Sequence, residues 1–126
     1  MTRGLLRMQW LFFVSGIGRV FRMILGIGSD IVHIPRVARV IEHPRFLERV
    51  YTVEERSYAE SRGKGMAASL AARFAGKEAV LKAFGTGLRN GCLRDVEILP
   101  DALGAPQVHL YGWFAQRAAE MGVVHM

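Results

Sequence analysis

One short stretch combines the residue types that could bind a phosphorylated ligand. Residues 73–82 form an alanine-rich segment, predicted to be helical, that carries Arg73, Lys77, Glu78 and Lys82. Glu78 and Lys82 are four residues apart, so they share one face of that helix. A carboxylate among several cations suits a polyphosphate bound together with a hard divalent metal ion.

A second carboxylate could complete such a metal site. Asp30 follows a glycine-containing strand end, so Asp30 and Glu78 would offer oxygen ligands from two separate elements. Magnesium usually keeps waters and substrate phosphates as its other ligands, so two protein carboxylates are enough. Lys77 and Lys82 could neutralise phosphate oxygens as point charges, and Arg73 could bind one as a fork.

The turn that follows the helix is rich in glycine. Gly85 and Gly87 would let backbone amides approach a ligand. Each feature also has an ordinary structural explanation when it is taken alone. A Glu–Lys pair four residues apart is most often a solvated surface pair, and a Gly-x-Gly after a helix is most often a C-cap. Spacing alone leaves both interpretations open.

Composition narrows the class of protein. The chain has 126 residues, which is enough for one domain. Of its net charge of +6, residues 1–22 carry four arginines and no acid, whereas residues 23–126 carry 13 basic and 11 acidic residues. A body this close to balance argues against nucleic-acid binding, which needs a clustered basic face. Cys92 is the single cysteine, so neither a disulfide framework nor a cysteine-based zinc site can form within one chain.

Residues 1–22 read as an N-terminal extension or targeting leader ahead of a domain at residues 23–126. The apolar run at residues 10–14 is too short to span a bilayer. An arginine-rich, acid-free segment is typical of mitochondrial transit peptides, with a short secretory signal as the other targeting option. Translation from Met23 with an unstructured extension, and a structured role, are the alternatives. We exclude the segment from the predicted fold and expect a cytoplasmic protein, or a mitochondrial one if it is a transit peptide.

Periodicity and turn residues predict the elements of the body. A capping box at Thr52 to Glu55 starts one helix, and Gly122 stops the last one. The predicted elements are a strand at 23–28, helices at 35–42, 52–62 and 66–84, strands at 95–99 and 107–111, and a helix at 112–121.

Several motifs occur in one order along residues 23–124. They are Gly26-Ile-Gly-Ser-Asp30, Thr52-x-x-Glu55, Arg73-Phe-Ala-Gly-Lys-Glu78, Lys82-Ala-Phe-Gly85-Thr-Gly87, Asp95-Val-Glu-Ile98 and Leu103-Gly-x-Pro106. Together they resemble the holo-acyl-carrier-protein synthase family of 4′-phosphopantetheinyl transferases. The resemblance implies an α+β fold in which a long central helix packs on an antiparallel sheet.

The resemblance also implies an activity. Members of the family transfer the 4′-phosphopantetheine arm of coenzyme A to a serine of an acyl carrier protein and release adenosine 3′,5′-bisphosphate. Magnesium bridges the pyrophosphate, and the enzymes commonly form trimers with active sites between subunits. Fatty-acid and polyketide carriers remain alternatives as substrates, and we expect neither nucleic-acid binding nor stable membrane insertion.

The family motifs assign roles to particular positions. Asp30 and Glu78 match metal carboxylates, and Glu78 and Lys82 match the catalytic pair. Either Glu78 or a metal-bound water accepts the serine proton. The residues that match the coenzyme A site are Arg73, Phe74, Lys77, Gly85, Thr86 and Gly87. Those that match cations facing the acidic helix of the carrier are Arg36 and Arg45.

The resemblance has one large departure. The family continues past Met126 with a strand of the form His-x-Ser-x-Thr-His and a last sheet strand. We therefore expect a C-terminally incomplete domain with its last strands missing. The alternative function is a truncated, inactive homologue that at most binds coenzyme A or the carrier protein.

Overall fold

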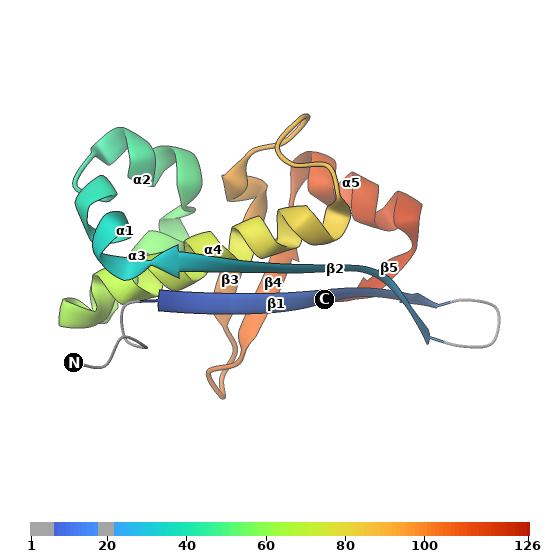
Figure 1. The fold of residues 1–126 in the computed structure, drawn as a ribbon, viewed down its shortest axis with the longest axis horizontal. Coiled ribbons are helices and arrows are strands. Elements are labelled where there is room, and N and C mark those ends of the chain that lie inside the picture. The colour runs from blue at the N-terminus through green and yellow to red at the C-terminus, as the bar shows by residue number, and fades with distance from the viewer. Residues whose placement is uncertain (1–6, 18–21) are drawn as a thin grey trace.

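The computed structural model describes residues 7–17 and 22–126 (Figure 1). Helices and strands interleave along the chain, as expected for an α+β fold. In chain order the elements are β1 (Arg7–Ile17), β2 (Arg22–His33), α1 (Ile34–Val40), α2 (Pro44–Val50), α3 (Val53–Ser61), α4 (Met66–Phe84), β3 (Val96–Pro100), β4 (Pro106–Leu110), α5 (Gly112–Met121) and β5 (Val123–His125).

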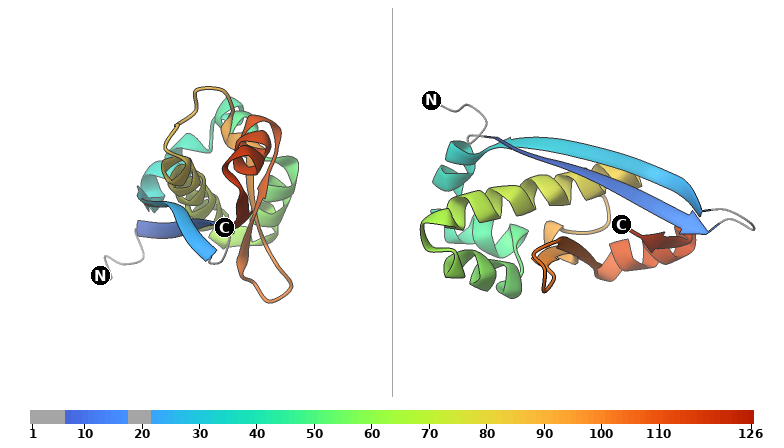
Figure 2. Two further views of the ribbon diagram at one scale, coloured as in Figure 1. Left: turned by 90° about the vertical axis from the view of Figure 1, so that its right-hand side faces the viewer. Right: turned by 90° about the horizontal axis from the view of Figure 1, so that it is seen from below.

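Two antiparallel sheets frame the long helix α4. The first has the order β2-β1-β5, and the second is the hairpin β3-β4. In the first sheet Trp10 is the backbone partner of Asp30, and the register shifts by one residue between Val14 and Ser15. Helix α4 runs along β1 and β2, and α3, α4 and α5 lie on the same side of that ribbon (Figure 2). The predicted α+β fold, with a long helix on an antiparallel sheet, is confirmed.

The exclusion of residues 1–22 from the fold is wrong for residues 7–17. These residues form β1, which lies between β2 and β5 in the sheet. The run Trp10-Leu-Phe-Phe-Val14 is rich in aromatic and β-branched residues, which favour strands, and pairing with it satisfies one edge of β2. Whether the segment also acts as a targeting leader stays a prediction.

Two glycines let β2 lie directly on the helix. A Cβ at Gly28 would collide with the carbonyl oxygen of Ala79, and a Cβ at Gly26 with that of Ala83. Both obstacles are backbone atoms of α4, which cannot rotate away as a side chain can. These positions therefore require glycine, and the close approach brings Asp30, two residues after Gly28, next to α4.

The core lies between α4, α3, the β3-β4 hairpin and α5. Its largest fully buried apolar side chains are Tyr51, Leu70, Val80, Val96, Ile98 and Phe114. The Tyr51 hydroxyl donates a hydrogen bond to the Leu70 carbonyl at 2.8 Å, so its one polar atom is satisfied. In the part of the chain that the structure describes, no helix is long and apolar enough to cross a bilayer.

The predicted helix boundaries agree best with the structure where a capping residue or a glycine marks the end of the helix. The Thr52–Glu55 capping box is present, and Gly85 and Gly122 end α4 and α5 in the left-handed conformation. Helix α2 is absent from the predicted elements, which leave residues 43–51 between two helices, and Pro44 lies within that segment. It occupies the first turn of α2, where its missing N–H costs nothing.

A buried ion pair joins α3 to α4. The Lys77 ammonium lies 2.8 Å from a carboxylate oxygen of Glu55, and both side chains are fully buried. Lys77 also donates to the carbonyls of Leu93 and Val96, at 2.9 and 2.6 Å. Burial lowers the pKa of Lys77, and the Glu55 charge opposes that shift. Lys77 is thus held by three acceptors inside the protein.

Candidate functional site

Helix α4 is buried on almost every side. Within residues 70–84, Phe74, Glu78 and Lys82 are the only side chains that are not buried. They are spaced four residues apart and so form a single line along the helix. A helix that is buried around the rest of its circumference has no ordinary solvated face. The line Phe74–Glu78–Lys82 is therefore where α4 can meet a ligand.

Asp30 meets this line from β2. The Lys82 ammonium lies 2.8 Å from Asp30 Oδ1 and donates a second hydrogen bond to the Ser29 carbonyl at 3.0 Å. The Asp30 side chain is 18% exposed, whereas that of Lys82 is 54% exposed. The predicted partners Asp30, Glu78 and Lys82 are thus brought together although the sequence separates them by about 50 residues.

The environment of Glu78 disfavours its charged form. Burial raises the pKa of the Glu78 carboxyl, the nearby Asp30 charge raises it further, and Lys82 opposes both effects. Two carboxylates that repel one another in a partly buried place gain from a shared cation. This is the electrostatic arrangement expected where a protein binds a metal ion through carboxylate oxygens.

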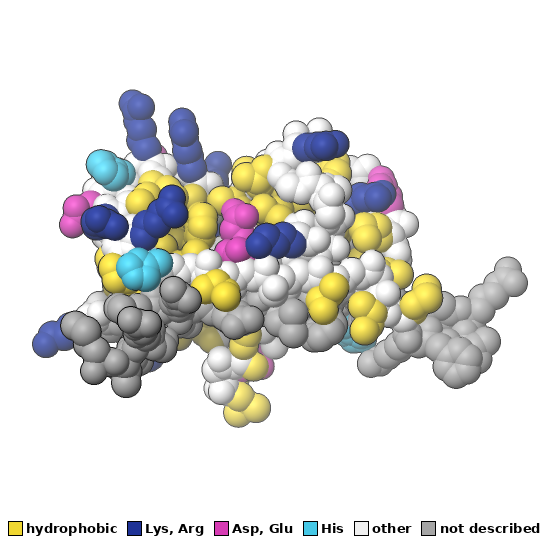
Figure 3. All heavy atoms as spheres, in the orientation of Figure 1, with side chains coloured by type: hydrophobic (Ala, Val, Ile, Leu, Met, Phe, Trp, Pro, Cys, Tyr) yellow, Lys and Arg dark blue, Asp and Glu magenta, His cyan; other side chains and the backbone are white. Residues whose placement is uncertain are grey.

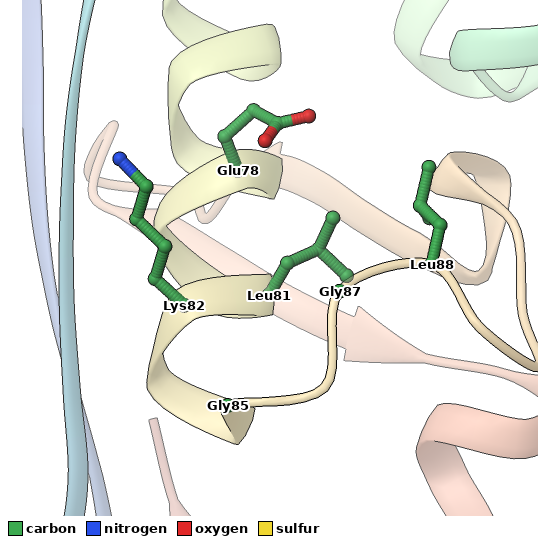
Figure 4. Close-up of a pocket in the computed structure, with 6 residues that line it drawn as sticks. All are labelled: Glu78, Leu81, Lys82, Gly85, Gly87 and Leu88. Atoms are coloured by element: carbon green, nitrogen blue, oxygen red, sulfur yellow. The ribbon is translucent and has the colours of Figure 1, made fainter.

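A pocket of about 510 Å³ opens beside these side chains. Figure 4 shows Lys82 extending toward β2, Glu78 one turn away on the same helix, and Leu88 on the loop beyond. Its lining residues are Glu78, Leu81, Lys82, Gly85, Gly87 and Leu88. The volume is within the range of small-molecule sites, which is about 300–1,000 Å³.

Sequence reasoning missed the apolar wall of this pocket. Leu81 of α4 and Leu88 of the following loop line it together with the charged groups. Leu88 is 45% exposed and follows Gly87 directly, and a leucine beside a glycine turn carries no signal in the sequence that would mark it as a pocket residue. The wall gives the pocket an apolar surface for the uncharged part of a ligand.

The donor set fits magnesium better than a softer metal. Among the described residues no group of three or more histidine, cysteine or acidic side chains could enclose a metal ion. Asp30 and Glu78 supply carboxylate oxygens, and the open pocket leaves room for water and phosphate oxygens as the remaining ligands. Hard oxygen ligands with several open positions are typical of magnesium sites that also hold a phosphorylated substrate.

A second pocket continues the line toward the N-terminus of α4. It has a volume of about 460 Å³ and is lined by Phe74 of α4, Arg36 and Val37 of α1, and His33. Arg45, in the first turn of α2, is exposed at the same end of the molecule. Figure 3 shows basic side chains gathered over the α1–α2 end and acidic and basic side chains side by side near the middle of this face.

Two predicted coenzyme A contacts lie elsewhere. Lys77 is fully buried against Glu55, so the structure does not bring it to the pocket. Arg73 is 8% exposed, donates to Ser69 and stacks over the Tyr58 ring at 4.4 Å. Both follow from helical geometry, because positions 73 and 77 point toward α3 when positions 74 and 78 face the opening. Thr86 sits between the two pocket glycines without lining the pocket.

The arrangement has counterparts in known proteins. The profile of the 4′-phosphopantetheinyl transferase superfamily matches residues 26–125. The chain belongs to this superfamily. The family prediction, and with it the prediction of a phosphopantetheinyl transferase enzyme, is confirmed.

The chain is similar to proteins named holo-[acyl-carrier-protein] synthase. The chain is 49% identical over 89 residues to a holo-[acyl-carrier-protein] synthase of Ruminiclostridium cellulolyticum, an alignment that covers 68% of this chain and 66% of the relative.

Solved structures of holo-[acyl-carrier-protein] synthases have the same fold. That from Neisseria meningitidis is 37% identical with a TM-score of 0.73, over 82% of this chain and 84% of the other. That from Bacillus anthracis, in complex with CoA (3′,5′-ADP), is 34% identical with a TM-score of 0.63, over 70% and 76%.

Proposed function

We propose that the chain transfers the 4′-phosphopantetheine group of coenzyme A to a serine of an apo acyl carrier protein in a magnesium-dependent reaction. The observation that carries the proposal is that Asp30 meets Lys82 and acts on Glu78, the two charged residues that line one pocket. Relatives 49% identical bear the name of this activity, and one solved relative holds coenzyme A, which supports the choice of donor.

Asp30 and Glu78 would hold the magnesium ion. When bound, it would supply charge neutralisation and orientation for the pyrophosphate of coenzyme A. The pocket beyond Gly85 and Gly87 has backbone amides and an apolar wall at Leu88, which suits a nucleotide with both charged and uncharged parts.

The chemistry is phosphoryl transfer by positioning and charge stabilisation. The serine oxygen of the carrier attacks the β-phosphorus of coenzyme A in line. The bond from that phosphorus to the bridging oxygen breaks, and adenosine 3′,5′-bisphosphate leaves. Lys82 offsets charge on the phosphate oxygens. Glu78 would also be a candidate acceptor of the serine proton, because it is a carboxylate that lines the same pocket.

Intact-mass analysis tests the proposal. An apo carrier protein is incubated with this chain, coenzyme A and magnesium chloride, and a carrier with its serine replaced by alanine is the control. We expect the mass to rise by one phosphopantetheine group on the native carrier alone. A folded chain that binds coenzyme A and leaves the carrier unchanged would refute the transferase and favour the inactive homologue.

Arg36 and Arg45 are proposed to meet the acidic helix of the carrier. Arg36→Glu should raise KM for the carrier at least about tenfold, because like charges placed together at an interface cost several kcal/mol. Its KM for coenzyme A should stay unchanged, since Arg36 lines the second pocket and not the first. Steady-state kinetics at several salt concentrations checks this, with Arg117→Glu on α5 as the control. Equal KM values for the carrier would contradict the assignment.

We also propose that the chain forms a homotrimer through the outer face of β2. Ile27 and Ile31 are 56% and 55% exposed on the face opposite Gly26 and Gly28, which touch α4. Neighbouring exposed apolar side chains of this kind mark interaction surfaces. Sedimentation velocity should give a trimer for the native chain and a smaller species for Ile27→Asp. Leu103→Asp, at the tip of the β3–β4 hairpin, should remain trimeric, and a native monomer would overturn the proposal.

A further inference from the structure

Lys82 forms an ion pair with Asp30, one of the two carboxylates that would bind the proposed magnesium ion. Its ammonium lies 2.8 Å from Asp30 Oδ1 and is bonded to the Ser29 carbonyl at 3.0 Å. Among the described residues, Lys82 is the one cation within ion-pair distance of Asp30 or Glu78. The same side chain cannot hold Asp30 in this way and also contact a phosphate deeper in the pocket.

The Asp30–Lys82 contact compensates a like-charge problem. The carboxylates of Asp30 and Glu78 act on one another through their charges, and a positive charge between strand and helix offsets their repulsion. Lys82 thus gives the two acids the counter-charge that a divalent ion would give them. In the absence of metal, its positive charge offsets the negative charges of Asp30 on β2 and Glu78 on α4.

The Lys82 side chain can change conformation, whereas the Lys77 side chain on the same helix cannot. The side chain of Lys82 is 54% exposed and lines the open pocket, so the flexible four-carbon stem has room to change conformation. Lys77, five residues earlier, is fully buried and held by Glu55 and two backbone carbonyls. Lys77 is therefore a fixed structural group, whereas Lys82 is held through the hydrogen bonds of its ammonium group.

The geometry points to Lys82 as a displaceable internal counter-ion. It pairs with Asp30 while the site is empty, gives up Asp30 when a divalent cation is bound, and turns into the pocket to meet a phosphate of the nucleotide. This rests on the proposed function, because it takes Asp30 and Glu78 as the metal ligands. Lys82 is then a positioning residue in the empty site and a substrate contact in the filled one.

The exchange couples the two ligands. A divalent ion that binds alone must separate Lys82 from Asp30 and leave the ammonium without an anionic partner. Coenzyme A supplies that partner, so each ligand should bind more tightly when the other is present. The coupling should depend on Lys82 and on no other lysine.

Binding of Mn²⁺, used as a spectroscopic substitute for magnesium, tests the exchange without turnover. Electron paramagnetic resonance titrations without carrier protein compare the native chain, Lys82→Gln and the control Lys64→Gln. Lys82→Gln should bind Mn²⁺ alone about two- to fivefold more tightly, because a partly exposed ion pair is lost as a competitor. The tightening that coenzyme A causes in the native chain should shrink in Lys82→Gln and persist in Lys64→Gln.

Lysine labelling reads the movement directly. The sequence has three lysines, of which Lys77 is fully buried and Lys64 is exposed. Acetylation followed by peptide mass spectrometry should show faster labelling of Lys82 when Mn²⁺ is added and slower labelling when coenzyme A follows. Lys64 should label at a constant rate throughout.

The outcomes separate this inference from the proposed function. If the native chain binds Mn²⁺ but Lys82→Gln binds it no more tightly, or if Lys82 labelling does not change, the exchange is refuted and the metal site stands. If the folded native chain binds no Mn²⁺, with or without coenzyme A, the metal site itself is refuted and the exchange with it.

Discussion

Glu78→Gln should lower turnover about a hundredfold or more, since charge stabilisation by a bound metal ion is worth several kcal/mol and each 1.4 kcal/mol is a factor of ten in rate. Glutamine keeps the size of the side chain but offers the cation no negative charge, and it cannot accept the serine proton. The rate of phosphopantetheine transfer at saturating coenzyme A and carrier measures the loss. Turnover equal to that of the native chain would refute the role of Glu78.

Glu78→Gln should not lower the free energy of unfolding. Burial and the Asp30 charge raise the pKa of Glu78 above its value in the unfolded chain. The folded state therefore holds this proton more tightly. The stability that the proton contributes is present below the unfolded pKa and is lost as the pH rises through the folded pKa. Without metal at neutral pH, Glu78→Gln should be as stable as the native chain or more stable.

This pH dependence separates catalytic loss from misfolding. Urea denaturation in the presence of a chelator should show the native chain losing stability relative to Glu78→Gln between acidic and neutral pH. A variant that is less stable than the native chain at neutral pH would mean that Glu78 has a structural role. Its low turnover would then say nothing about metal binding.

Lys77→Met should destabilise the fold by about 3–5 kcal/mol, because it leaves the buried Glu55 carboxylate without its counter-charge. Glu55 is also an anchor for the backbone, since it accepts hydrogen bonds from the Ile98 N–H at 2.7 Å and the Thr52 N–H at 2.9 Å. The loss is a large part of the total stability of a typical domain, about 5–15 kcal/mol. Denaturant titration of the free energy of unfolding measures it.

The double variant Lys77→Met with Glu55→Gln is the control for this prediction. It removes both charges, and the glutamine oxygen still accepts a hydrogen bond from one of the two backbone N–H groups, so it should recover part of the lost stability. A role for Lys77 in coenzyme A binding would have the opposite signature. The single variant would then fold as stably as the native chain and bind coenzyme A more weakly.

The contrast between Lys77 and Lys82 shows what the sequence could reveal about the site. Both lie on α4 and both match positions of the family motif. Their roles separate only when the rotation of the helix is known, and α4 is too uniformly apolar for periodicity to set that rotation. The Asp30–Glu78–Lys82 grouping was predicted, because separated motifs in one order identify a family even where local spacing is ambiguous.

The strand β1 and the apolar wall could not be predicted for different reasons. Residues 7–17 have an arginine-rich, acid-free context that favours a leader, and their role as a strand depends on a partner, β2, that the local pattern does not reveal. Leu88 lines the pocket because the turn at Gly85 and Gly87 reverses the chain after α4. A leucine in a loop carries no chemical signal of its own.

The burial of α4 limits which of its residues can be substituted during evolution without loss of the fold. A substitution at most positions from 70 to 84 alters the core and lowers the amount of folded protein, whatever it does to the reaction. Changes at Glu78 and Lys82 alter what the protein binds and leave its packing largely intact, whereas Phe74 also packs against Phe46, so a change there affects both. New specificity can therefore arise on this helix chiefly at Glu78 and Lys82. A mutational scan that measures abundance and activity separately should lower activity alone at these two positions and lower both at the buried ones.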